Sequence, residues 1–132
     1  MKNCIVVAVL MSLGGLMLAE ETELSAQMKI LDAAFSTLRK PDAASGRQVV
    51  RKAEQIGVAY ENMIEFWRQR KAEDAVKWSE AGKAAALQLA TAMSSGDAER
   101  VAVAMKSLGG TCRSCHEAHR EKLSDGRYRI KL

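Results

Sequence analysis

The sequence predicts an all-α protein, an antiparallel up-down-up-down four-helix bundle. Apolar residues make up 48% of the 132 residues. They recur every three or four positions over four long segments, which is the spacing of one helix face. Aromatic residues make up only 5%, so the core must be built from Ala, Leu, Val, Ile and Met, a composition that favours helices. The connections between the segments are short, and short connections join antiparallel neighbours.

Residues 1–19 have the layout of a secretory signal peptide. A positive start is followed by an uncharged apolar run that ends at Leu18, and acidic residues begin at Glu20. The run is shorter than the roughly 20 residues that span a bilayer as a helix, so we expect cleavage after Ala19. The exported protein would be one domain over residues 20–132, located in the periplasm. An uncleaved membrane anchor is the alternative.

The first two helices are expected on either side of Pro41. The first begins after Thr22 as its N-cap and ends before the proline, because the residue before proline disfavours helical geometry. The second begins at a capping box that starts with Ser45 and ends in the charged turn around Arg68. The apolar stripe of the first helix is Leu24, Met28, Leu31, Phe35 and Leu38. That of the second is Val49, Ala53, Ile56, Tyr60, Met63 and Trp67.

The third helix is expected over residues 73–93 and the fourth from Asp97 to about Leu123. Small residues on the seam of the third helix, such as Gly82, permit close packing, and residues 94–96 break the helix. The last six residues form a short basic tail, expected to be a solvated end.

One motif carries the chemistry: Cys112-Arg113-Ser114-Cys115-His116, which is C-x-x-C-H, the signature of covalent c-type haem attachment. On a helix, residues at i, i+3 and i+4 share a face. The two thiols can therefore reach the two vinyl groups on one edge of a porphyrin, and the imidazole of His116 can bind the iron. We expect one haem c, held by Cys112 and Cys115.

Three other interpretations of the two cysteines are weaker. A thioredoxin-like pair would sit at a helix N-terminus, whereas these lie in the second half of a helix. A zinc site of Cys112, Cys115, His116 and His119 would draw all its ligands from one helix, and tetrahedral sites normally use two segments. Two inert buried cysteines are the third alternative.

The chain resembles the cytochrome c′ family, which consists of exported four-helix bundles with C-x-x-C-H on the last helix. As in that family, an arginine, Arg120, follows the histidine by four positions. The resemblance implies His116 as the proximal iron ligand. It also places Met28 at the helix-one position that faces the iron, where six-coordinate members carry a ligating Met and five-coordinate members a non-ligating residue. The family often has Arg four residues earlier, near a haem propionate, where this chain has Leu24.

The leading hypothesis is therefore a periplasmic electron carrier, not an enzyme, with His116 and Met28 as axial ligands. Met63 lies at a suitable level but on the helix diagonal to the last one. The alternative is a five-coordinate haem protein that binds NO or CO. A peroxidase-like enzyme would need polar groups over the iron, and the stripe around Met28 offers none.

The distribution of charge along the sequence indicates which classes of partner to expect. The formal net charge is +4, but the two signs are interspersed and form no basic cluster, so no nucleic-acid partner is expected. Redox partner proteins are expected, and contact with a membrane only through the signal segment before cleavage. The resemblance also leaves open a homodimer through the first two helices.

Overall fold

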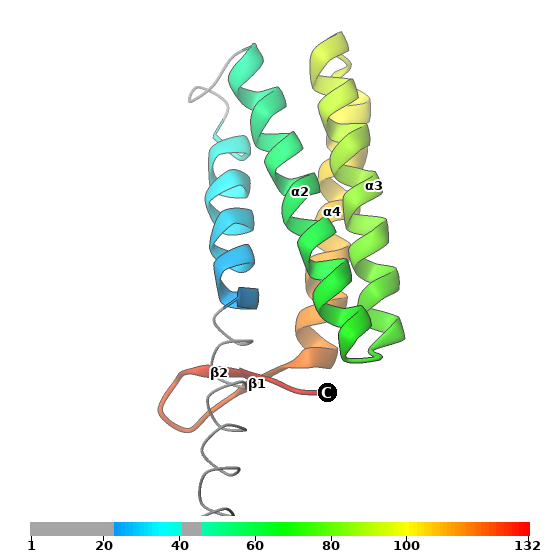
Figure 1. The fold of residues 1–132 in the computed structure, drawn as a ribbon. Coiled ribbons are helices and arrows are strands. Elements are labelled where there is room, and N and C mark those ends of the chain that lie inside the picture. The colour runs from blue at the N-terminus through cyan, green and yellow to red at the C-terminus, as the bar shows by residue number, and fades with distance from the viewer. Residues whose placement is uncertain (1–22, 41–45) are drawn as a thin grey trace, which may run out of the picture.

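The computed structural model describes residues 23–40 and 46–132 and confirms the predicted all-α four-helix bundle. The first helix covers residues 23–38. The other three are α2 (Arg47–Gln69), α3 (Glu73–Ser95) and α4 (Ala98–His119). Figure 1 shows the four helices side by side, with directions that alternate along the chain. The predicted signal peptide and the predicted caps at Thr22 and Ser45 fall outside the described residues.

The connection between α3 and α4 is as tight as the sequence predicts. Gly96 adopts the left-handed conformation at φ 69°, and its N–H bonds the carbonyl oxygens of Ala92 and Met93, which closes α3. A carboxylate oxygen of Asp97 accepts the backbone N–H of Arg100 at 3.0 Å and caps α4. These caps satisfy backbone groups that helix ends leave unpaired, so the chain reverses within two residues.

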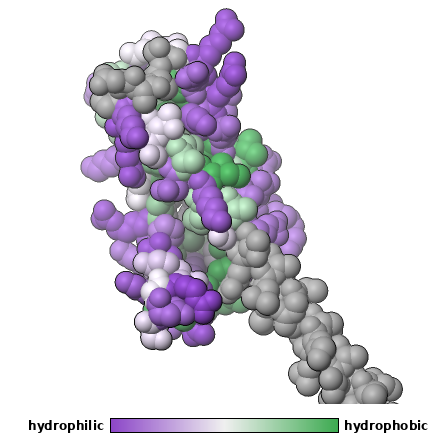
Figure 2. Space-filling model, turned by 90° about the vertical axis from the view of Figure 1, so that its left-hand side faces the viewer, coloured by the Kyte–Doolittle hydropathy of each residue, from purple (hydrophilic) through white to green (hydrophobic). Residues whose placement is uncertain are grey.

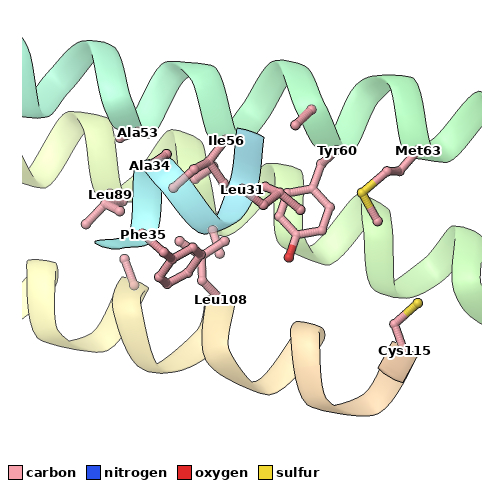
Figure 3. Close-up of a cluster of buried hydrophobic side chains, with 14 of the residues drawn as sticks. Leu31, Ala34, Phe35, Ala53, Ile56, Tyr60, Met63, Leu89, Leu108 and Cys115 are labelled. Atoms are coloured by element: carbon pink, nitrogen blue, oxygen red, sulfur yellow. The ribbon is translucent and has the colours of Figure 1, made fainter. Parts of the chain in front are cut away.

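The core runs along the axis of the bundle. Helix α3 packs against both α2 and α4, and the first helix contributes to the same core cluster. Figure 3 shows large apolar side chains from all four helices converging on this axis. The fully buried ones include Ile56, Leu89 and Leu108. Toward the end of the bundle that carries the C-x-x-C-H motif, these side chains leave a cavity.

The outer surface is mostly polar. Figure 2 views the molecule from the side of the first helix, and hydrophilic side chains cover most of that face, with small hydrophobic patches between them. None of the helices within residues 23–40 and 46–132 is both long enough and apolar enough to cross a membrane.

The C-terminal segment differs from the prediction. Helix α4 ends at His119, not near Leu123, because Arg120 has extended backbone angles, φ −120° and ψ 124°. Two short strands follow, β1 (Arg120–Lys122) and β2 (Tyr128–Ile130), and they pair antiparallel. The turn between them uses Gly126 at φ 85°. Most of the last six residues are exposed, as predicted, but part of this tail is the strand β2, and Ile130 packs against the core.

Candidate functional site

A cavity of about 620 Å³ lies at the C-x-x-C-H end of the bundle. All four helices and the hairpin contribute to its wall. The volume falls within the range of roughly 300–1,000 Å³ that small-molecule and cofactor sites occupy. The lining side chains include Leu24, Met28, Leu31 and Phe35 of the first helix, Tyr60, Met63 and Trp67 of α2, Trp78 of α3, Cys112, Cys115, His116 and His119 of α4, and Tyr128 and Ile130 of β2.

The structure brings the three motif residues to one side of this cavity. Cys112, Cys115 and His116 all line it from α4, as residues at i, i+3 and i+4 on one helix face should. Cys115 is buried and Cys112 is half-buried, and both are free thiols. His116 is three residues from the end of α4, because the helix ends at His119 and not near Leu123.

Two methionines line the cavity from the other helices. Met28 is half-buried on the first helix, with Leu24 and Leu31 buried near it along the same stripe. Met63 lines the cavity from α2 and is 2% exposed. In Figure 3 the side chains of Met63 and Cys115 come from opposite walls and point toward one another. Met63 therefore reaches the site although α2 was expected to lie diagonal to α4. The cavity offers two thioether sulfurs, those of Met28 and Met63.

The protonation states at the motif suit haem attachment. Burial above all, together with the nearby Asp74 and Cys112, raises the pKa of the Cys115 thiol to about 11, so the thiol keeps its proton at neutral pH. Burial lowers the pKa of His116, and the positive charge of Arg120 lowers it too. The neutral imidazole, which is the form that binds a metal, is favoured.

Tyr60 reaches the first cysteine from the opposite wall. The Thr111 hydroxyl donates to the carbonyl oxygen of Leu108 at 2.8 Å, which uses its single hydrogen. The Tyr60 hydroxyl must therefore donate to Thr111 Oγ1, 2.9 Å away. Cys112 Sγ lies 3.5 Å from the same phenol oxygen, which is free to accept from the thiol. Burial raises the pKa of Tyr60, so the phenol stays a donor.

The ring of Tyr60 occupies space that a glycine leaves open. A Cβ added at Gly82 of α3 would lie 2.4 Å from two atoms of the Tyr60 ring and 2.7 Å from a third. No side chain fits there while Tyr60 keeps its position. The absence of a side chain at Gly82 thus allows Tyr60 to lie between α2 and α3 with its hydroxyl at the cavity.

His119 is engaged on both ring nitrogens. Nδ1 lies 2.7 Å from the carbonyl oxygen of Lys131, and Nε2 lies 3.0 Å from a carboxylate oxygen of Asp74. A carbonyl oxygen only accepts hydrogen bonds, so Nδ1 donates to Lys131, and Nε2 faces the carboxylate of Asp74. Slight burial raises the pKa of Asp74, but the hydrogen bonds from His119 and from the Ala75 N–H outweigh it and lower the pKa overall.

The cavity wall also holds an unpartnered polar atom. Among the described residues, the buried Nε1 of Trp67 has no hydrogen-bond partner. Buried donors are nearly always paired, and Trp67 is also one of the residues that line the cavity. A flat aromatic cofactor fits this wall, because Trp67 and Trp78 supply ring surfaces beside the C-x-x-C-H motif. The residues present thus fit a covalently bound haem.

The zinc alternative finds no support in the described part of the chain. There, no group of three or more His, Cys, Asp or Glu side chains is arranged to hold a metal ion. His119, one of the four residues it would need, bonds Asp74 and Lys131 instead.

The comparisons with known proteins agree with this geometry. Residues 24–120 match the family model described as cytochrome C′. The chain belongs to the cytochrome c′ family. A curated relative, cytochrome c′ of Pararhodospirillum photometricum, is 39% identical over 98 residues, which are 74% of this chain. The chain spans about 65% of the length of that relative. No solved structure matches the chain.

Family membership makes the protein a c-type haem protein, with haem c bound covalently. It confirms the resemblance that the C-x-x-C-H motif and the helical pattern indicated. The roles of individual residues are inferred from the geometry of the site.

Sequence reasoning missed several residues of the site. The strand residues Tyr128 and Ile130 line the cavity although the tail was expected to be solvated. The signal was present, because Asp125-Gly126 is a turn pair and alternation follows it. No local pattern could have revealed the contact of Asp74 with His119, which lies 45 residues further along the chain.

Proposed function

We propose that the exported chain is a periplasmic electron carrier with one haem c. Cys112 and Cys115 hold the haem through thioether bonds, and His116 and Met28 are its axial ligands. The observation that carries the proposal is that one cavity collects the C-x-x-C-H motif from α4 and a methionine from the first helix. When bound, the haem supplies the one-electron Fe(III)/Fe(II) couple, and a thioether ligand favours the ferrous form.

The residues around the cavity perform distinct tasks in this function. The Cys115 thiol keeps its proton, and Cys115, together with Cys112, would hold the haem through a thioether bond. His116 is available as a neutral ligand, whereas His119 is held away by Asp74 and Lys131. Arg39 and Arg120 line the cavity and offer positive charge to the haem propionates in place of the arginine that Leu24 replaces.

A five-coordinate protein that binds NO or CO is the second candidate. It is favoured by the apolar side chains of Leu24 and Leu31, which flank Met28 on the cavity wall. With Met28 as a packing residue only, this stripe would form an apolar pocket for a small diatomic ligand. Both functions use the same haem attachment, and they differ in whether a thioether fills the sixth coordination position.

The first experiment tests haem attachment. Extraction of the purified protein with acidified organic solvent should leave the pigment with the polypeptide, because thioether bonds survive this treatment. Substitution of Cys112 and Cys115 together by alanine should release it. A colourless protein precipitate from the unsubstituted chain would contradict covalent attachment.

The second experiment identifies the sixth ligand with a matched pair of variants. Met28→Leu and Met63→Leu each remove one thioether sulfur from the cavity wall while nearly conserving side-chain volume, which keeps the packing cost small. We expect a low-spin ferric spectrum for the parent, a high-spin spectrum for Met28→Leu and a low-spin spectrum for Met63→Leu.

Each other outcome of this pair has a definite meaning. A switch to high spin in Met63→Leu alone would assign the ligand to α2. A parent protein that is already high-spin, and that neither substitution changes, would overturn the carrier proposal in favour of the gas-binding function.

A further inference from the structure

Apart from its first residue, Arg120, the C-terminal hairpin lies outside the part of the chain that the family model matches. The match ends at residue 120, whereas the hairpin comprises β1 and β2 up to Ile130. Arg120 pairs with Ile130, and Lys122 pairs with Tyr128. Residues paired directly across antiparallel strands share a face, so these four side chains belong to one face of the hairpin.

Three residues of that face, Arg120, Tyr128 and Ile130, line the cavity, and Arg129 of the other face also reaches it. Ile130 also packs against the hydrophobic core of the bundle. The guanidinium of Arg120 lies over the Tyr128 ring, 4.3 Å from its centroid. The hairpin therefore contributes an apolar residue, an aromatic ring and a positive charge to one end of the cavity.

Hydrogen bonds between Lys131 and His119 fix the hairpin to the bundle. The N–H of Lys131, directly after β2, donates to the carbonyl oxygen of His119 at 2.9 Å, and the carbonyl of Lys131 accepts from the His119 ring. The other ring nitrogen bonds Asp74 of α3. The ring itself is only 10% exposed and lies 4.9 Å from the Trp67 ring. The ring of His119 thus joins the tail, α3 and the aromatic wall.

We propose that this hairpin is part of the haem site, where Ile130, beside the half-exposed ring of Tyr128, excludes water from one side of the bound haem and raises its reduction potential. The ferric haem carries one more positive charge than the ferrous haem, and charge is more costly to hold where water is excluded. The positive charge of Arg120 acts in the same direction. The proposal rests on the haem attachment of the proposed function, but not on the identity of the sixth ligand.

The test compares two aliphatic residues of the same tail in the haem-loaded protein. Ile130→Ser changes a residue that lines the cavity, whereas Leu132→Ser makes the same change at a residue that is 78% exposed and does not line it. A chain that ends at Leu123 removes the whole of β2. The reduction potential of each is measured by spectroscopic redox titration, together with its unfolding by urea.

We expect the potential to fall in Ile130→Ser and to fall further in the shortened chain, while Leu132→Ser keeps the parent value. A shortened chain with an intact haem spectrum and an unchanged potential would overturn the proposal. So would an Ile130→Ser variant that loses stability without a shift in potential, because the hairpin would then be only structural. If the shortened chain does not fold, the Ile130 and Leu132 pair still decides the outcome.

Failure of this proposal is distinct from failure of the proposed function. The identity of the sixth ligand is tested by the spin state of the Met28 and Met63 variants. The role of the hairpin is tested by the reduction potential of the Ile130 and Leu132 variants. A high-spin protein whose reduction potential depends on Ile130 would refute the electron-carrier proposal. It would still support the proposal that the hairpin excludes water from the haem.

Discussion

Replacement of Gly82 by alanine should destabilise the protein, although alanine is the better helix former. The added Cβ would come within 2.4 Å of the Tyr60 ring. That ring cannot move aside easily, because it is 3% exposed and its hydroxyl is bonded to Thr111. Overpacking of a core costs about 1–3 kcal/mol, whereas glycine to alanine within a helix gains about 0.5–1 kcal/mol. We expect a net loss of up to about 2.5 kcal/mol.

The assay is urea unfolding of the ferric protein, with Gly57→Ala as the control. A Cβ at Gly57 would meet only the Cβ of Ala86 at 3.8 Å, an ordinary contact. Gly57→Ala should therefore show the helix gain alone, about 0.5–1 kcal/mol of added stability. The two substitutions are chemically identical and both lie within helices, so their difference isolates the contact with Tyr60.

A double-mutant cycle tests whether the contact with the Tyr60 ring causes the loss of stability. In a Tyr60→Leu background the ring is gone, so Gly82→Ala should become neutral or stabilising, with a coupling energy between the two positions of about 1–3 kcal/mol. If Gly82→Ala stabilises the parent protein as much as Gly57→Ala does, the Tyr60 ring does not depend on the space at Gly82.

Four further predictions follow from the same structure. Leu108→Ala should lower the free energy of unfolding by about 2–5 kcal/mol, measured in urea, because the side chain is 0% exposed; a loss below that range would indicate that the core can close around the gap. The lowered pKa of Asp74 contributes stability that is present above the unfolded-state pKa and is lost as pH falls through the folded value. Asp74→Asn should therefore flatten the stability–pH curve at its acid end, and an unchanged curve would show that the bond to His119 contributes nothing. His119→Ala should keep the Soret band, since His116 binds the iron; loss of the band would show that the wrong imidazole was assigned. The intact mass of the exported protein should equal a chain beginning near Glu20 plus one haem, and a larger mass that retains the leader would favour a membrane anchor.

The four-helix bundle could be predicted from the sequence because the signals that indicate helices are local and repeated along the chain. Apolar steps of three and four residues fix a helix face, and breakers such as Gly96 fix where a helix ends. The structure has these helices with bounds close to those expected, apart from the end of α4. That end was misplaced because the helix was expected to run up to the breaker Ser124-Asp125-Gly126, while the pairing of Arg120 with Ile130 favours an extended backbone there.

The candidate site was predictable in its chemistry but not in its full wall. The motif at Cys112, Cys115 and His116 identifies the cofactor through spacing alone. The bond between His119 and Asp74 and the position of Ile130 at the cavity arise from tertiary contacts between distant segments, and no periodicity encodes such contacts. Met63 was set aside by an argument from helix order, whereas the cavity is wide enough for α2 to reach it as well.

The close fit of Tyr60 against Gly82 has a consequence for how this family member can change over time. An alanine or serine at position 82 is tolerated only after the ring at position 60 has become smaller, so the two sites should be substituted together or not at all. Among relatives aligned to this chain, an aromatic residue at position 60 should occur with glycine at position 82. Relatives with a larger residue at position 82 should carry a small aliphatic side chain at position 60. A set of relatives in which the two positions vary independently would show that the helices adjust their spacing instead.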